Sequence, residues 1–253
     1  MTVFEGGVGS AGDRRREQAL ALVAAASLDD GNEGSALVLE LRALCRATAD
    51  CLALQGAVVN LMTRPGDDWV VASSDERSLR VGELSFTLGE GPSVDAFSQG
   101  RPVIVPDLSA SGRRQWAGYA STALGLGVGA VFALPLHVGA VRLGVLETYA
   151  DEARALDDEE MAMLLSFARV GTEVLLDGRA EAPGATLDRQ RNVALDHRAE
   201  VHQAQGMVMV DLGIGLAEAL VRMRAHAFSR EVALIDVARE IIAGAVLPGG
   251  SES

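Results

Sequence analysis

Residues 198–242 read RAEVHQAQGMVMVDLGIGLAEALVRMRAHAFSREVALIDVAREII, and this stretch decides the fold of the C-terminal part of the chain. Apolar residues recur in it at three- and four-residue spacing, which predicts helices with one apolar face each. The first helix leads into Leu212 and ends at the glycine pair Gly213 and Gly215, the second spans Leu216–Phe228, and the third spans Leu234–Val246. The stretch therefore predicts a small all-α module of three helices.

The chain as a whole has the composition of a globular protein. Its 253 residues are 49% hydrophobic and 23% charged, which allows two domains with a core each. Apolar runs such as Val128–Leu136 are far shorter than the roughly 20 residues that span a bilayer, and residues 1–12 do not resemble a secretory signal. We therefore expect a cytoplasmic protein without membrane contact. Cys45 and Cys51 lack metal-site or redox spacing and are expected to be two buried thiols.

The negative charge is concentrated outside the C-terminal module. The formal net charge is -13, which disfavours a generic polyanion binder because phosphate contacts need cations. Residues 188–247, however, hold seven Arg against eight Asp and Glu, so that the acidity belongs to the rest of the chain. All 22 basic residues are Arg, the better side chain for gripping phosphate and stacking on bases.

Residues 36–178 predict an α+β domain, an antiparallel sheet with helices on it. The expected order is a helix at 36–54, a strand hairpin at 56–73, an irregular segment or short helix at 77–86, a loop with a short helix at 88–97, a strand at 103–105, a helix at 116–126, a second hairpin at 129–150 and a long helix at 156–177.

The remaining segments flank these two units. Residues 1–35 predict an extension with one helix, Asp13–Ser27, whose apolar half needs a packing partner such as a second subunit. Residues 179–187 contain Pro-Gly and predict a linker, 188–247 form the C-terminal module, and 248–253 a tail. Roughly heptad-spaced apolar residues in 187–212 also favour one long helix there, able to form a coiled coil.

Two groups of motifs resemble known families. The A-x-G-M-x-M, A-L-x-x-M-R-A and L-x-D-V-A runs of the C-terminal module resemble the ANTAR domain, the RNA-binding module of bacterial transcription antiterminators. LGEGPSVDAF, GRPVIVPDL and GLGVGAVFALPLHVGAVRLGVLETY, followed by a helix, resemble a GAF domain of the type that precedes ANTAR in actinobacterial regulators.

The ANTAR resemblance implies binding to paired RNA hairpins in a nascent transcript, which stabilises an antiterminator. The residues that match the family pattern are Arg198, Ala204, Gly206, Ala219, Arg222, Arg224, Asp236 and Ala238. The alanines serve equally well for helix packing or RNA contact, whereas Arg222 and Arg224 favour contact. Leu220 stands where the family usually has an aromatic residue and Gln205 where it often has Lys, which weakens the expected RNA affinity.

The GAF resemblance implies a small-molecule pocket between the sheet and its covering loops. By position its walls would be Val59, Leu61, Ser93, Phe97, Val105, Leu134 and Glu147, and the same positions are equally consistent with side chains that fill the core. Glu147 faces either the pocket or water. The sequence lacks a cyclic-nucleotide signature and a cysteine for a bilin, and Ser93 stands where related sequences often have Cys. No cofactor, metal or catalytic residue is therefore expected.

The leading hypothesis is a non-enzymatic, signal-responsive antitermination regulator that acts as a homodimer, with 156–177 and 187–212 pairing between subunits. The first alternative is a small-molecule sensor whose C-terminal helices bind a protein partner instead of RNA. An enzyme is disfavoured because no nucleophile–base pair is evident. DNA binding through a helix-turn-helix is disfavoured because the last helix carries only Arg239 as a cation.

Overall fold

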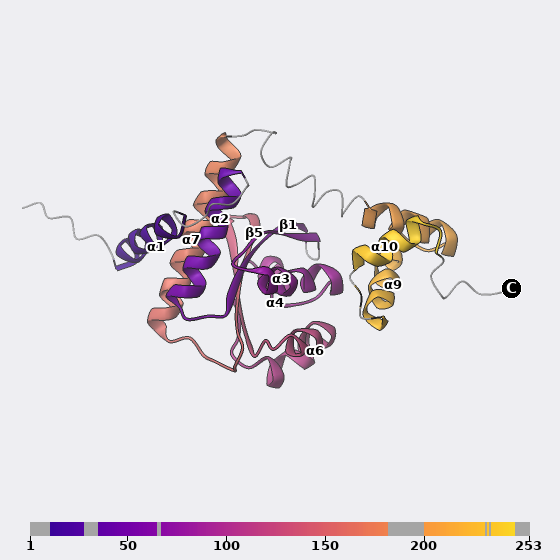
Figure 1. The fold of residues 1–253 in the computed structure, drawn as a ribbon, viewed down its shortest axis with the longest axis horizontal. Helices are drawn as coiled ribbons and strands as arrows, with labels where there is room; N and C mark the ends of the chain where they lie inside the picture. The colour runs from indigo at the N-terminus through magenta and orange to yellow at the C-terminus, as the bar shows by residue number, and fades with distance from the viewer. Residues whose placement is uncertain are drawn as a thin grey trace, which may run out of the picture.

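The computed structural model describes residues 11–27, 35–64, 67–181, 200–230, 232 and 234–245. Its centre is a five-stranded antiparallel sheet in the order β2-β1-β5-β4-β3. The strands are β1 (Gly56–Arg64), β2 (Asp67–Ser73), β3 (Val103–Val105), β4 (Ala130–Val138) and β5 (Val141–Ala150). Helices cover both faces of this sheet and a helical module follows it, which confirms the predicted α+β fold with an all-α C-terminal part (Figure 1).

Two hairpins meet at the centre of the sheet, because β1 pairs with β5. A tight turn at Gly139 joins β4 to β5. Gly139 has a positive φ of 56°, and a Cβ added there would meet no atom within 4 Å. Both faces of the central strands are buried, so the strands read as nearly continuous apolar runs instead of alternating ones.

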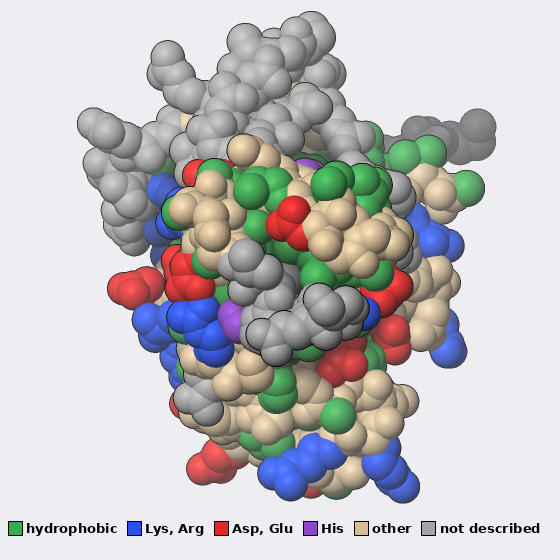
Figure 2. Space-filling model, turned by 90° about the vertical axis from the view of Figure 1, so that its right-hand side faces the viewer, with side chains coloured by type: hydrophobic (Ala, Val, Ile, Leu, Met, Phe, Trp, Pro, Cys, Tyr) green, Lys and Arg blue, Asp and Glu red, His purple; other side chains and the backbone are tan. Residues whose placement is uncertain are grey.

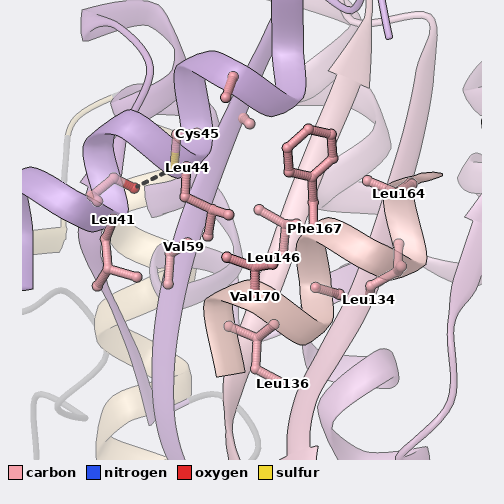
Figure 3. Close-up of a cluster of buried hydrophobic side chains, with 14 of the residues drawn as sticks. Leu41, Leu44, Cys45, Val59, Leu134, Leu136, Leu146, Leu164, Phe167 and Val170 are labelled. Carbon is pink, nitrogen blue, oxygen red and sulfur yellow. Dashed lines mark hydrogen bonds between the residues drawn. The ribbon is translucent and has the colours of Figure 1, made fainter. Parts of the chain in front are cut away.

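Three helices form the layer on one face of the sheet: α1 (Ala11–Ser27), α2 (Ala36–Cys51) and α7 (Asp158–Glu181). Figure 3 shows the core beneath them, where Leu44 of α2 and Phe167 of α7 meet Leu146 of β5. All three side chains are fully buried, and each such side chain stabilises the fold by roughly 1.5–3 kcal/mol.

The two cysteines of this layer differ in environment, so the expectation of two buried thiols holds only for Cys45. Its side chain is 0% exposed, its Sγ lies 3.7 Å from the carbonyl oxygen of Ala72, and burial raises its pKa to about 12. Cys51 ends α2 and is exposed.

Helix α1 packs on its own chain. Ala19 and Val23 belong to the same apolar core as α2 and α7, and two ion pairs fasten the helix to α7: Arg15 to Glu159 at 2.8 Å, and Arg16 to Glu173. The partner that its apolar face requires is thus supplied within the chain, and the helix is part of this layer.

The opposite face of the sheet is covered by shorter elements: α3 (Glu76–Leu88), α4 (Pro92–Gln99), the π-turn η1 (Leu108–Gly112), α5 (Arg113–Gln115) and α6 (Ala117–Gly125). Helix α3 is longer and more regular than expected from its sequence. Its start is fixed by Asp75, whose carboxylate accepts a hydrogen bond from the backbone N–H of Ser78, a strong N-cap.

The C-terminal module has the three predicted helices: one through residues 200–212, α9 (Leu216–Ser229) and α10 (Leu234–Ile242). They enclose a second apolar core, with Val208, Met223 and Val237 at its centre. The last helix ends at Ile242, earlier than expected, because the chain turns at Gly244 with a φ of 102°. Arg198 and the segment 182–199, with most of the predicted linker, lie outside the described residues.

Candidate functional site

The five-residue segment Gly89–Ser93 runs from the end of α3 into the first turn of α4. Its residues contact several side chains on the face of the sheet that these helices cover. Gly89 ends α3 in the left-handed conformation, with a φ of 69°. Gly91 has a φ of 140°, and a Cβ there would stand 2.8 Å from the ring of Tyr119. Pro92 then opens α4, a position where its missing N–H costs nothing.

Glu90 connects this segment to α6. Its carboxylate oxygen Oε1 accepts hydrogen bonds from the backbone N–H groups of Gly118 and Tyr119, at 2.7 and 3.0 Å. These N–H groups lie in the first turn of α6, where no partner exists within the helix and a negative charge is favoured. Glu90 thereby fixes the place of Tyr119.

A buried polar cluster lies beneath the segment, formed by Glu147 of β5, Ser93 of α4 and Tyr119 of α6. The Tyr119 hydroxyl donates to Glu147 Oε1 at 3.0 Å, and the Ser93 hydroxyl donates to Oε2. All three residues are 0% exposed. Burial raises the pKa of Glu147 to about 7, although the two hydroxyl donors offset part of that effect. Burial and the neighbouring carboxyl group raise the pKa of Tyr119 as well.

Two more buried polar side chains on this face have polar atoms without a hydrogen-bond partner among the described residues. Asn60 of β1 is 0% exposed, and neither its Oδ1 nor its Nδ2 has a hydrogen-bond partner among the described residues. It stands opposite Val145, one diagonal step from Glu147 across the β1–β5 pair. Ser85 of α3 is also 0% exposed, and its hydroxyl likewise has no hydrogen-bond partner among the described residues. Buried polar groups of this kind cost free energy unless something binds them.

The seven residues expected to wall a pocket fall on two faces of the sheet. Ser93, Phe97, Val105 and Glu147 lie on the face covered by α3, α4 and α6. Val59, Leu61 and Leu134 lie on the opposite face, packed in the core beneath α2 and α7; Figure 3 labels the first and third of them. One pocket walled by all seven is therefore not formed, because neighbouring positions along a strand point to opposite sides.

A cleft of about 540 Å³ lies beside the edge strand β3, between the end of α4 and the η1–α5 segment. Val105 lines it, whereas the other six predicted wall residues do not. Its rim carries the charged side chains Asp95, Arg101 and Asp107. Asp107 also caps η1 by accepting from Ser109 and from the N–H of Ala110, and these bonds lower its pKa.

In the C-terminal module, three of the predicted RNA contacts are buried. Ala204, Ala219 and Ala238 are each 0% exposed and belong to the apolar core between the helices, so in this structure they serve packing. Gly206 is different, because a Cβ added there would meet no atom within 4 Å. Asp236 is exposed in the first turn of α10.

The two predicted arginines of α9 have different surroundings. Arg222 pairs with Glu218 one turn earlier at 2.9 Å, and its side chain is 41% exposed. The Nε of Arg224 donates to the carbonyl oxygen of Phe86 in α3 at 3.2 Å. Both side chains are half-buried, Arg222 beside Glu218 on its own helix and Arg224 against α3. Figure 2 shows that the described Arg side chains on this side of the molecule lie in separate groups, with carboxylates between them.

Gln205 has a role that its sequence position did not reveal. It is 7% exposed, and its Nε2 donates to the carbonyl oxygen of Leu216 at 2.7 Å. The residue thus ties the first helix of the module to the start of α9, where a Lys would place a charge in the core.

Among the described residues, His, Cys, Asp and Glu side chains form no group of three or more suited to a metal ion, and no described helix is long and apolar enough to cross a membrane.

The sheet with its two helical layers and the family matches together define the class of this protein. The GAF domain family matches residues 40–175, more than half of the chain, and the chain belongs to that family. The ANTAR domain family matches residues 189–242. The protein is thus a GAF–ANTAR protein, with the two domains in the predicted order, and an ANTAR-type regulator.

Several solved structures resemble this chain at low identity. They include the GAF domain of the Acinetobacter phosphoenolpyruvate-protein phosphotransferase (13% identity, TM-score 0.48, covering 68% of this chain and 97% of that one). A free methionine-R-sulfoxide reductase from Neisseria meningitidis, solved with its substrate, has 16% identity and a TM-score of 0.49 and covers 72% of this chain and 100% of that one. The phycocyanobilin-bound GAF domain of a cyanobacterial phytochrome has 10% identity and a TM-score of 0.46, covering 69% and 98%. Likenesses this distant do not identify a ligand. No curated protein matches the chain.

Proposed function

We propose that this protein is a signal-responsive transcription antitermination regulator of the cytoplasm, in which the GAF domain senses and the ANTAR domain binds paired RNA hairpins in nascent transcripts. The observation that carries the proposal is the ANTAR domain itself, joined to a GAF domain in one chain. We propose further that the protein is not an enzyme, since the Ser93 hydroxyl and the Glu147 carboxyl group that accepts its hydrogen bond are both 0% exposed and offer no open face to a substrate.

Arg222 is the described residue best suited to an RNA phosphate. Its pair with Glu218 is exposed and lies within one helix; such pairs contribute only about 0.3–0.5 kcal/mol, so a phosphate can replace the carboxylate at little cost. Gly206, on the preceding helix, leaves open space where RNA backbone can approach closely.

The test is fluorescence anisotropy of the full chain with an RNA of two hairpins, compared with one of those hairpins alone. We expect affinity to fall as salt rises, because each neutralised phosphate releases counterions. Arg222→Ala should weaken binding roughly tenfold and lower the salt slope by about one. The matched control is Arg169→Ala on α7, which removes a comparable exposed pair, with Glu173 at 3.5 Å. Salt-independent binding, or equal effects of the two substitutions, would contradict the proposal.

We propose a homodimer as the active form, so that two ANTAR domains engage two hairpins and gain from effective concentration. Leu165 and Leu176 on α7 support this, because they are 47% and 39% exposed on a helix whose other described apolar residues are buried or half-buried. Light scattering coupled to chromatography, with and without RNA, measures the mass. A monomer under both conditions would exclude this mechanism.

A protein partner is the second candidate for the C-terminal module. Val221 and Phe228 are 61% and 48% exposed and lie two turns apart on one face of α9, and Val210 of the preceding helix is 72% exposed. Exposed apolar side chains that share a face are typical of protein-binding surfaces. This candidate predicts no binding of the two-hairpin RNA at any salt concentration, together with lost function of Val221→Ser in the cell.

A further inference from the structure

Helix α9 of the ANTAR domain rests on the C-terminal end of α3 in the GAF domain. Arg224 provides the contact: its Nε donates to the carbonyl oxygen of Phe86 at 3.2 Å, and its guanidinium carbon lies 6.0 Å from the centre of the Phe86 ring. Phe86 itself packs against the apolar core of the C-terminal module. Figure 1 shows that module on the α3 side of the sheet, away from α1 and α7.

The end of α3 is chemically suited to hold an arginine. The last four carbonyl groups of a helix lack partners within it and carry the negative end of the helix dipole. The Ser85 carbonyl is taken by the N–H of Gly89, and the next one, that of Phe86, receives Arg224. The Phe86 ring adds a face over which a guanidinium is favoured.

Gly89 contributes to this contact beyond its backbone conformation. A Cβ at this position would stand 2.4 Å from Nη1 of Arg224, closer than two such atoms can approach. The guanidinium therefore occupies the space that any other residue would fill, and the glycine is part of the surface that receives it.

We propose that the C-terminal end of α3, formed by Phe86 and Gly89, is an intramolecular docking surface for α9, and that it competes with RNA for Arg224. This inference rests on the proposed RNA-binding function. The Arg224 guanidinium donates to the Phe86 carbonyl through Nε and lies against Gly89 at Nη1. A phosphate cannot reach the side of the guanidinium that these two contacts occupy. The docked domain therefore offers RNA only part of its cations: Arg222, whose exposed pair with Glu218 a phosphate can replace, is offered, and Arg224 is held.

The docking surface is continuous with the buried polar cluster, which gives the sensor domain a means of control. Gly89 touches Arg224, Glu90 holds the start of α6, and Ser93 donates to Glu147. A ligand bound inside the GAF domain that moves the segment Gly89–Ser93 also displaces Arg224 from the surface of that domain. Release of Arg224 and engagement of RNA then follow from the same movement.

Two glycine substitutions separate the docking effect from the backbone effect. Gly89→Ala and Gly100→Ala both place a side chain at a helix end in the left-handed region, with φ of 69° and 64°. Only the first presses a methyl group on Arg224, since the nearest atom to a Cβ at Gly100 is Nε of Arg142 at 3.3 Å. The two substitutions therefore carry a similar backbone cost of folding, but only Gly89→Ala disturbs the contact with Arg224.

The readouts are anisotropy with the two-hairpin RNA and the radius of gyration from small-angle X-ray scattering without RNA. We expect Gly89→Ala to bind RNA about three- to tenfold more tightly than Gly100→Ala, the range for loss of one hydrogen bond of ordinary net strength, and to have the larger radius. A second pair checks the same surface if Gly89→Ala folds poorly: Phe86→Ala against Leu79→Ala, a residue 36% exposed on α3.

Equal affinities and equal radii within both pairs would overturn the inference. Equal affinities with a larger radius for Gly89→Ala would overturn the competition with RNA. If no variant binds RNA, the proposed function and the competition fail together, while the radii still decide whether α9 docks on α3.

Discussion

Glu147→Gln should make the protein more stable at neutral and alkaline pH while leaving its stability in acid nearly unchanged. The carboxyl group is 0% exposed and has Ser93 and Tyr119 as its hydrogen-bond partners. A glutamine amide keeps both contacts, because its oxygen accepts from one hydroxyl and its NH₂ group donates to the other. The substitution therefore removes a titrating group with little change of shape.

The size and sign of the effect follow from the pKa of Glu147, which is about 7 in the folded protein against an ordinary value of 4.5. Below the ordinary value, the group is protonated in the folded and unfolded states alike. Between the two values the folded state binds the proton and the unfolded state does not, so the free energy of unfolding falls as pH rises. At about 1.4 kcal/mol per pH unit, the full loss is about 3 kcal/mol, and it is complete above the folded pKa.

Urea denaturation of both proteins at about pH 5 and about pH 8 measures this difference. The variant should gain most of the 3 kcal/mol relative to the natural protein between these conditions. The control is Glu152→Gln, which removes an exposed carboxylate just beyond β5 and should show no such divergence. Parallel pH dependence of Glu147→Gln and the natural protein would refute the assignment of a buried, proton-binding carboxyl group.

Two further substitutions test the packing that places the two domains' functional residues. Gly144→Ala puts a Cβ 2.1 Å from the carbonyl oxygen of Asn60 and should lower the free energy of unfolding, measured by urea denaturation, by about 2 kcal/mol or more. Its control is Gly125→Ala, whose Cβ meets nothing within 4 Å and which should be neutral or stabilising. Gln205→Ala breaks the 2.7 Å bond to Leu216 and should cost about 1–2 kcal/mol in thermal unfolding followed by circular dichroism, whereas Gln203→Ala, exposed on the same helix, should not.

The elements of the fold were predictable because local signals define them. Gly213 and Gly215 separate the first two helices of the C-terminal module, and the turn at Gly139 separates two strongly apolar strands. Helix α3 was underpredicted because three of the four residues on its buried face, Ser78, Gly82 and Ser85, are not apolar side chains. The order of the two domains was predicted from their motifs and is confirmed by both family matches.

The candidate site was predicted less completely, since its geometry depends on distant contacts. Both faces of β1, β4 and β5 are buried, so the sequence did not show that Val59 and Glu147 point to opposite sides. Tyr119 precedes Glu147 by 28 residues and has no motif of its own, yet it shares the carboxyl group with Ser93. The contact between Arg224 and Phe86 joins positions 138 residues apart, and nothing local to either one predicts it.

The two cysteines differ in exposure, so their reaction with a thiol reagent can report local opening of the GAF domain. A thiol reagent can reach Cys51 at the end of α2 in the folded protein, whereas Cys45 is 0% exposed and held protonated by its buried surroundings. Modification of Cys45 then requires the layer formed by α1, α2 and α7 to separate from the sheet, and its rate reports the free energy of that opening. Mass spectrometry, counting one adduct or two over time, would follow the motions of the sensor domain without any engineered label.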